Sequence, residues 1–200
     1  IINSYSEMLM KLETAFTMDT SSIKFGKGVT REIGSDFKNI GVKRLMICTD
    51  NRVAKLSTME VVKASLKEVE LEYEIYSGVS VEPTDVSFLE AIDFARKGDF
   101  DGYLGVGGGS SMDTVKAANL YATYPPEDFL DYVNPPIGKG KPVPGPIKPM
   151  ICIPTTAGTG SETTGVAIFD LLSMEAKTGI AHRSLRPLMG IIDPDNTRSL

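Results

Sequence analysis

Three consecutive glycines, Gly107, Gly108 and Gly109, mark the part of the chain with the clearest chemical signature. They lie between an apolar run and a segment with helical spacing, and Ser110 and Asp113 follow them. Glycines let the backbone approach a ligand closely, and the first turn of a helix offers unpaired N–H groups and a positive dipole end. This arrangement is typical of a cradle for the pyrophosphate of a dinucleotide. It departs from the G-x-G-x-x-G motif, because Ser110 occupies the third glycine position.

A second polar loop, residues 154–164, follows another apolar run and reads Pro-Thr-Thr-Ala-Gly-Thr-Gly-Ser-Glu-Thr-Thr. Its hydroxyls can bind phosphate, ribose or the amide of nicotinamide. Taken alone, an ordinary solvated loop explains the segment equally well, because Ser, Thr and Gly are common in loops for conformational reasons. Its place beside the glycine cradle in one predicted sheet favours a binding loop.

Asp50 ends the earliest clear apolar run, residues 44–50. A carboxylate at the end of a strand can accept the hydroxyls of a ribose, and it would repel the 2′-phosphate of NADP. In the common dinucleotide motif this acidic residue lies about 20 residues after the glycines, whereas Asp50 precedes them. The alternative is a structural role as a helix N-cap, where Asp is frequent.

The chain contains one histidine, His182, and two cysteines, Cys48 and Cys152. A single histidine excludes a His-rich metal site or an H-E-x-x-H motif within this sequence. We expect His182 to be a surface or loop residue rather than a catalytic base, because no motif surrounds it. Both cysteines lie in apolar runs, which predicts buried thiols in a reducing compartment rather than a disulfide.

Short apolar runs alternate with amphipathic segments along the chain. This alternation predicts right-handed βαβ units, a mostly parallel sheet, and ligands bound beyond the carboxyl ends of the strands. Residues 134–149, which are rich in proline, are expected to form a long surface loop. The predicted strands are residues 44–50, 73–76, 102–106 and 150–153, and the predicted helices are 8–16, 61–69, 84–97 and 113–124.

The overall composition narrows the class of partner. The 200 residues, 42% hydrophobic and 24% charged, suit one or at most two globular domains. A net charge of -5 without a long run of Lys or Arg argues against nucleic acid or a membrane surface as a partner. The apolar runs are far shorter than the roughly 20 residues needed to span a bilayer. A protein that handles small molecules fits these properties best.

Residues 107–113 followed by residues 154–162 resemble the paired signature of the iron-containing alcohol dehydrogenases. The resemblance extends from residue 25 to residue 194. It implies an α/β fold with a Rossmann-like, mostly parallel sheet flanked by helices, as in the N-terminal domain of dehydroquinate synthase-like proteins. It also implies that residues 1–200 are the NAD-binding N-terminal domain, and that an all-helical second domain, which holds the iron through an Asp and three His, is missing from this chain.

The same resemblance implies which residues bind NAD. Asp50 would hold the adenosine ribose, and Lys177 would complete the ribose side. Family members often carry Asn-Pro where this chain has Glu82-Pro83, so a cofactor contact from that Asn is not carried over. No catalytic or metal-binding residue is carried over either. The pyrophosphate region would be contacted by Gly108, Gly109, Ser110 and Asp113, and the reactive end of the cofactor by Thr155, Thr156 and Thr159.

Further segments resemble one branch of the family, the hydroxyacid-oxoacid transhydrogenases. That branch implies NAD-dependent hydride transfer from a hydroxy acid, 4-hydroxybutyrate, to an oxo acid, 2-oxoglutarate, with Fe2+ or another divalent metal in the full-length enzyme. It implies a mitochondrial location in a eukaryote and a cytoplasmic one otherwise, and it leaves a homodimer open. Two alternatives are an ordinary NAD-dependent iron alcohol dehydrogenase acting on small alcohols, and a non-catalytic nucleotide-binding domain. The branch-like segments are residues 81–85, 118–122, 128–132, 136–142 and 164–169.

Overall fold

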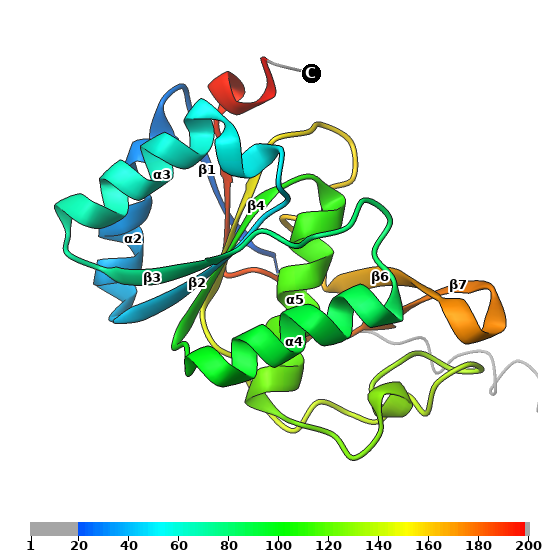
Figure 1. The fold of residues 1–200 in the computed structure, drawn as a ribbon. Helices are drawn as coiled ribbons and strands as arrows, with labels where there is room; N and C mark the ends of the chain where they lie inside the picture. Colours follow the sequence, from blue (N-terminus) through cyan, green and yellow to red (C-terminus); the bar gives the residue numbers. More distant parts are fainter. Residues whose placement is uncertain (1–19, 199–200) are drawn as a thin grey trace, which may run out of the picture.

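Six parallel strands form the central sheet of the computed structural model, which describes residues 20–198 (Figure 1). Every neighbouring pair of strands in this sheet is parallel. The predicted α/β fold with a mostly parallel sheet is therefore confirmed. In spatial order the strands are β1 (Ser22–Phe25), β8 (Met189–Ile192), β5 (Met150–Pro154), β4 (Gly102–Gly107), β2 (Arg44–Cys48) and β3 (Glu72–Tyr76).

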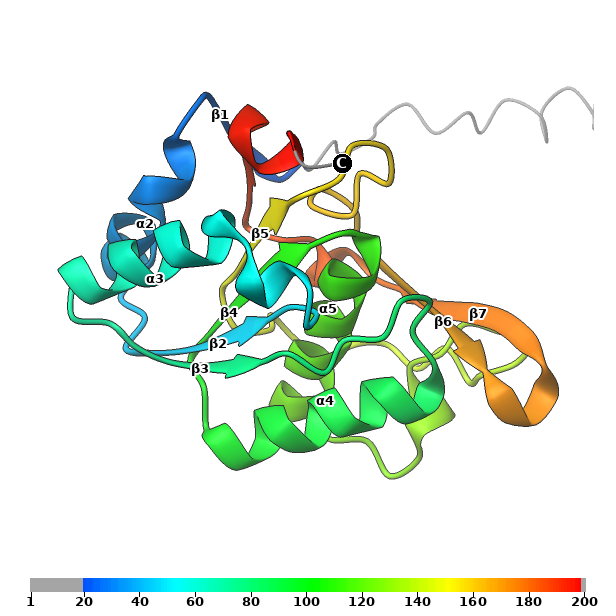
Figure 2. The same cartoon turned by 45° about the horizontal axis from the view of Figure 1, so that its top comes forward.

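Two helices cover each face of the sheet (Figures 1 and 2). Helices α2 (Ile33–Ile40) and α3 (Ser57–Glu68) pack on one face, and α4 (Asp85–Gly98) and α5 (Gly109–Thr123) pack on the other. Strands β4 and β5 are buried along their whole length, which explains why they read as continuous apolar runs rather than as alternating ones. No helix among residues 20–198 is long and apolar enough to cross a membrane.

Gly105 brings α5 close to the sheet. It lies in register between Cys48 of β2 and Cys152 of β5. A methyl group on Gly105 would lie 2.9 Å from Val115 Cγ1 and 3.5 Å from the Cα of Met112, both on α5. A side chain at this position would therefore push the helix away from the strands, together with the glycine turn at its start.

A separate antiparallel hairpin, β6 (Val166–Leu171) and β7 (Ala176–Ala181), lies beside α5 and extends past the N-terminal end of α4 (Figure 1). Its inner side packs in a third apolar cluster, in which the Phe169 ring lies 5.2 Å from the ring of Phe88 on α4. Short 3-10 helices complete the described chain: η1 (Val29–Glu32), η2 (Val53–Lys55), η3 (Phe129–Asp131), η4 (Leu172–Met174), η5 (Arg183–Leu185) and η6 (Pro194–Thr197).

The structure confirms the four predicted strands and three of the predicted helices. Helices α3 and α5 each begin four residues earlier than predicted, because their first turns are polar and carry little of the apolar spacing that defines a helix in sequence. Thr84 begins α4 as expected, since its side chain accepts a hydrogen bond from the Ser87 N–H. The loop over residues 134–149 contains no helix or strand, as predicted. The predicted helix over residues 8–16 lies outside the described residues.

Candidate functional site

The strand order places a crevice at the carboxyl ends of β2 and β4. The chain leaves β2 toward β3 on one side and returns to β4 on the other side of β2. The loops after β2 and β4 therefore diverge, and such a reversal is where open α/β sheets bind ligands. Asp50 follows β2 and Gly107 ends β4, and a methyl group on Gly107 would lie 3.7 Å from Asp50 Oδ2.

Two adjoining cavities open at this edge of the sheet. Cavity A has a volume of about 350 Å³, and cavity B has a volume of about 410 Å³. Ser110, in the first turn of α5, lines both. Of the nine predicted site residues, the structure places Asp50, Gly108, Thr155 and Thr156 at cavity A, Gly109, Asp113, Thr159 and Lys177 at cavity B, and Ser110 between them.

The glycine turn gives the two cavities their shared wall. Gly108 is the N-cap of α5, no side chain caps the helix there, and the first helical turn contains no acidic residue. Gly107 has φ 145°, and a methyl group on it would lie 2.5 Å from Ser111 Oγ, so this position requires glycine. The open helix start and its positive dipole end therefore face the cavities with no carboxylate in the first turn of α5 itself.

The threonine loop packs directly against this turn. The Thr155 N–H donates to the Gly107 carbonyl oxygen at 2.9 Å. A methyl group on Gly109 would lie 3.1 Å from Thr159 Cγ2, whereas one on Gly108 would lie at an ordinary contact distance of 3.5 Å from Thr156 Oγ1. Gly109 thus fits closely against the loop, and a side chain on Gly108 would extend into cavity A without a clash.

Asp50 has a structural role in the loop before η2, whose N-cap is Arg52 rather than Asp50, and it still faces the crevice. Its Oδ1 accepts hydrogen bonds from the N–H groups of Arg52 at 2.7 Å and Val53 at 2.9 Å, at the start of η2. Its Oδ2 has no such bond among the described residues and lies on the side of Gly107. One oxygen therefore orders the loop, and the other is available to a ligand.

Cavity B has a buried ion pair at its base. Lys116 is fully buried, and its Nζ lies 3.6 Å from Asp113 Oδ1. Asp113 Oδ2 accepts a hydrogen bond from the Ile168 N–H, while Oδ1 is buried without a hydrogen-bond partner among the described residues. Burial raises the pKa of Asp113 and lowers the pKa of Lys116, and each charge partly offsets the effect of burial on the other.

The hairpin supplies the outer wall of cavity B. Lys177 on β7 pairs with Asp170 on β6 at 3.3 Å, and its side chain remains 60% exposed. Ile168, whose side chain is partly exposed, and the adjoining Phe169 also line this cavity. An exposed cation and an apolar wall thus face the buried Asp113 across the cavity.

Several lining residues were not predicted from the sequence. Ser80 and Val81 follow β3 and line cavity A, where their place after a strand was the available signal. Pro83 lines cavity B, as does Thr164, which belongs to the predicted binding loop over residues 154–164 but was not singled out there. Lys116, which lies behind the lining, was also missed, because the residues it binds on β6 are distant in the sequence.

His182 and the cysteines lie away from both cavities. His182 precedes η5, and its Nδ1 accepts a hydrogen bond from the Ser184 N–H, which agrees with a loop residue. Cys48 and Cys152 are buried free thiols, as predicted. Burial raises the pKa of Cys152 to about 12 and raises that of Cys48 further, so neither is a thiolate at neutral pH.

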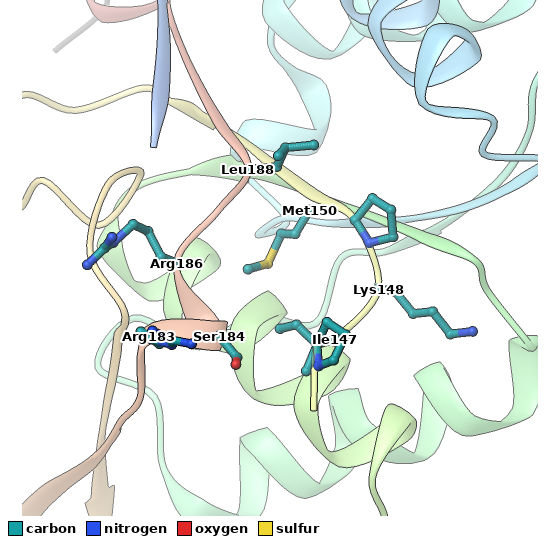
Figure 3. A pocket seen from close by; sticks show the side chains of 9 residues that line it. Ile147, Lys148, Met150, Arg183, Ser184, Arg186 and Leu188 are labelled. Carbon is teal, nitrogen blue, oxygen red and sulfur yellow. The ribbon is translucent and has the colours of Figure 1, made fainter. Parts of the chain in front are cut away.

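A further cavity, about 460 Å³, lies at the opposite edge of the sheet, before β5 and β8 (Figure 3). Met150 and Leu188 form part of its lining, and Arg183, Arg186 and Lys148 surround it (Figure 3). It contains none of the predicted site residues. Because ligands of such sheets bind at the carboxyl ends of the strands, we assign the site to cavities A and B.

The described residues fit a dinucleotide but not a metal ion. Cavities A and B meet at an uncapped helix start, which can hold a pyrophosphate, and each is lined by polar groups that can hold a ribose. In contrast, residues 20–198 contain no group of three His, Cys, Asp or Glu side chains that could bind a metal.

Comparison with known sequences agrees with this geometry. The family model described as iron-containing alcohol dehydrogenase matches residues 20–194. The mitochondrial hydroxyacid-oxoacid transhydrogenase of Xenopus tropicalis is 55% identical over 190 residues, which cover 95% of this chain and 41% of that protein. The human protein of the same name is 55% identical over 183 residues, covering 92% of this chain and 39% of that protein. The chain thus spans about two-fifths of the length of these curated relatives.

Solved structures show the same architecture. The NADH-dependent butanol dehydrogenase A of Thermotoga maritima superimposes with a TM-score of 0.84 at 29% identity, over 93% of this chain and 46% of that one. The sulfoacetaldehyde reductase of Bifidobacterium kashiwanohense, solved in complex with NAD+, has a TM-score of 0.81 at 25% identity, over 94% of this chain and 48% of that one. In both cases the similarity covers about half of the larger protein.

Proposed function

Because the chain belongs to the iron-containing alcohol dehydrogenase family, we propose that cavities A and B bind NAD(H) for a hydride-transfer reaction. The observation that supports this most directly is the uncapped start of α5 between two adjoining polar cavities. Ser110 and the backbone of Gly108 and Gly109 would hold the pyrophosphate there.

The two cavities suit different ends of the cofactor. Cavity A combines Asp50 with the apolar side chains of Val53, Leu56 and Val79, which suits an adenosine whose ribose is held by the carboxylate. Cavity B would then take the nicotinamide riboside, with Lys177 and Thr159 beside it. Asp113 lies in cavity B, so we place it near the nicotinamide end rather than at the pyrophosphate.

The residues of this chain would bind and orient the cofactor before hydride transfer takes place. The bound nicotinamide supplies the site that accepts or donates the hydride. Asp50 orders the loop after β2 and excludes a 2′-phosphate, and the apolar wall of Ile168 and Phe169 restricts water around cavity B. Residues 20–198 contain no group of three His, Cys, Asp or Glu side chains that could hold a metal, so we propose that iron or another divalent metal binds in the part of the full-length enzyme that the relatives carry beyond this chain.

We propose that the full-length protein is a mitochondrial hydroxyacid-oxoacid transhydrogenase, which oxidises 4-hydroxybutyrate while it reduces 2-oxoglutarate. The 55% identity to proteins of that name supports this assignment. The similarity to a butanol dehydrogenase favours a second candidate, a dehydrogenase that releases NADH in every cycle. Absorbance at 340 nm separates the two. A transhydrogenase forms product from both acids with catalytic NAD and without accumulating NADH, whereas a simple dehydrogenase accumulates NADH from the alcohol alone.

Gly108→Ala tests the nucleotide site itself. The substitution is compatible with the backbone, because φ at Gly108 is -80° and the new methyl group meets Thr156 at an ordinary contact distance. We expect a thermal midpoint within a few degrees of the wild type without ligand, and loss of most of the shift that saturating NADH produces. A normal NADH shift in this variant would place the pyrophosphate elsewhere.

A further inference from the structure

Two side chains of α5 bind the backbone of β6 directly. Lys116 Nζ donates to the Val166 carbonyl oxygen at 2.8 Å and to Thr164 Oγ1 at 3.3 Å. Asp113, one turn earlier, accepts from the Ile168 N–H at 3.1 Å. The ion pair that lies at the base of cavity B therefore attaches the hairpin to the helix whose first turn faces both cavities.

These hydrogen bonds take the place of those that a second neighbouring strand would form with β6. β6 pairs with β7 along one edge only, and its other edge is satisfied by Asp113, Lys116 and the Pro83 carbonyl oxygen, which accepts from the Asp170 N–H at 2.8 Å. A two-stranded hairpin is marginally stable by itself, so its place depends on what holds its edges. The Asp113–Lys116 pair holds the end of β6 nearest the threonine loop.

A buried charge pair is an expensive way to secure packing alone. Removing Lys116 from water lowers its pKa, and the same burial raises the pKa of Asp113. Apolar side chains of similar volume often stabilise a fold as well as a buried ion pair does, or better. The pair has a geometric property that apolar residues lack, because its hydrogen bonds fix the register of β6 against α5.

We propose that Lys116 is a positioning residue, which sets the distance of the hairpin, and of Lys177 on it, across cavity B. Lys116 would then control affinity for the nicotinamide half of the cofactor without contacting it. The inference rests on the proposed binding of NAD(H), and it adds a determinant that lies outside the lining of either cavity.

The test compares two ligands in Lys116→Met. ADP would occupy cavity A and the turn of α5, whereas NADH would also occupy cavity B. Lys116→Met removes the charged hydrogen bonds that hold β6, and NADH binding must then supply the free energy to place the hairpin. We therefore expect the dissociation constant for NADH to rise about tenfold, while the constant for ADP changes less than about twofold. Lys97→Met is the matched control, because Lys97 forms an exposed pair with Asp93 on α4 and should change neither constant. Equal losses for both ligands, or no loss for NADH, would overturn the proposal.

A double-mutant cycle with Lys177 tests the route of the effect. If Lys116 acts through the hairpin, the cost of Lys177→Met for NADH binding should shrink at least about threefold in the Lys116→Met background. Fully additive losses would overturn the proposal. Should Lys116→Met fail to fold, the same cycle is run in Asp113→Asn/Lys116→Met, which removes both charges and leaves no unpaired ion in the interior.

Amide hydrogen exchange separates this proposal from the proposed function. In Lys116→Met, exchange at Ile168 should accelerate at least about tenfold without ligand, while exchange at Leu104 of the central sheet is unchanged. Unchanged protection at Ile168 would show that the pair does not hold the hairpin, whatever the protein binds. If exchange at Ile168 accelerates in Lys116→Met but the wild type binds no NADH, the proposed function is wrong, while the role of the Asp113–Lys116 pair in holding β6 is supported.

Discussion

Asp50 uses its two carboxylate oxygens differently. Oδ1 accepts two backbone hydrogen bonds at the start of η2, and Oδ2 faces the crevice beside Gly107. The sequence left two interpretations open, a helix N-cap or a ribose ligand. The structure makes Arg52 the N-cap of η2, while Asp50 orders the loop before it through Oδ1 and leaves Oδ2 free for a ligand. Because both roles belong to one side chain, truncation to alanine would mix them.

Asp50→Asn separates cofactor choice from loop structure, because the amide oxygen can keep the two backbone hydrogen bonds while the charge is removed. We expect the ratio of NADP to NAD affinity to rise about tenfold, since repulsion between unit charges at about 4 Å costs roughly 1 to 4 kcal/mol at intermediate dielectric. Fluorescence titration with NADH and NADPH measures this ratio. Asp50→Ala should raise it similarly while also lowering stability by about 1 kcal/mol through the lost backbone hydrogen bonds. An unchanged ratio in both variants would remove Asp50 from the ribose site.

At the residue scale, the sequence identified the correct loops, but it did not show which of their residues are structurally essential. The predicted pyrophosphate site named Gly108 and Gly109. Gly107, however, is the glycine that has a positive φ and at which any side chain would clash with Ser111. Lys116 was not predicted at all, because its partners, Val166 and Thr164, lie about 50 residues away in the chain. Local spacing identifies the turn, but the backbone angle that makes Gly107 irreplaceable and the distant partners of Lys116 are visible only in the structure.

At the scale of elements, three of the four predicted strands are largely buried, and the fourth, β3, is a partly exposed edge strand whose Tyr-Glu-Ile-Tyr run still favours a strand. β4 and β5 read as continuous apolar runs and were found. β6 was missed because its burial alternates and Gly165 and two threonines precede it. β1 was missed because Ile23 and Phe25 remain exposed at the sheet edge, so four residues carry little pattern. Helix α2, eight residues long, lacks the length that makes spacing informative.

The proline-rich loop is held in place by a charge cluster at its start. Asp131 is 3% exposed, and its two oxygens contact Lys139 Nζ at 2.8 Å and Lys141 Nζ at 3.0 Å. The hydrogen bond from Lys139 is the largest cause that lowers the pKa of Asp131 from 3.8 to about 2. The Asn134 N–H donates to the Gly179 carbonyl oxygen, so the same loop also supports the outer edge of β7.

This cluster predicts a specific loss of stability in acid. Because the folded pKa of Asp131 lies below its unfolded value, the stabilising contribution is complete above about pH 4 and is lost as the pH falls toward about 2. Urea unfolding between pH 5 and pH 2 should therefore show a shallower decline for Asp131→Asn than for the wild type. Asp93→Asn, which breaks an exposed pair with Lys97, is the control and should follow the wild type. Parallel curves for Asp131→Asn and the wild type would contradict the assignment.

At the scale of the whole molecule, the sheet joins the ligand site to the core. Cys48 and Cys152 flank Gly105 in register on three neighbouring strands, and two of these strands, β2 and β4, end at Asp50 and the glycine turn. Both thiols are fully buried, so neither can react while this part of the sheet is closed. Their reactivity therefore reports the opening of the same strands that carry the proposed nucleotide site.

We expect the two thiols to be alkylated at the same rate, and NADH to slow both by the same factor. Burial raises the pKa of Cys152 to about 12, so reaction requires opening of the sheet, in which the thiolate becomes accessible. A ligand that binds only the folded state reduces the open population by 1 + [L]/Kd, which is about 100-fold at a free concentration of 100 Kd. Peptide mass spectrometry after timed exposure to iodoacetamide measures each cysteine separately. Faster labelling of one cysteine would mean that β2 and β5 open independently, and labelling of both that NADH does not slow would mean that the cofactor does not stabilise this sheet.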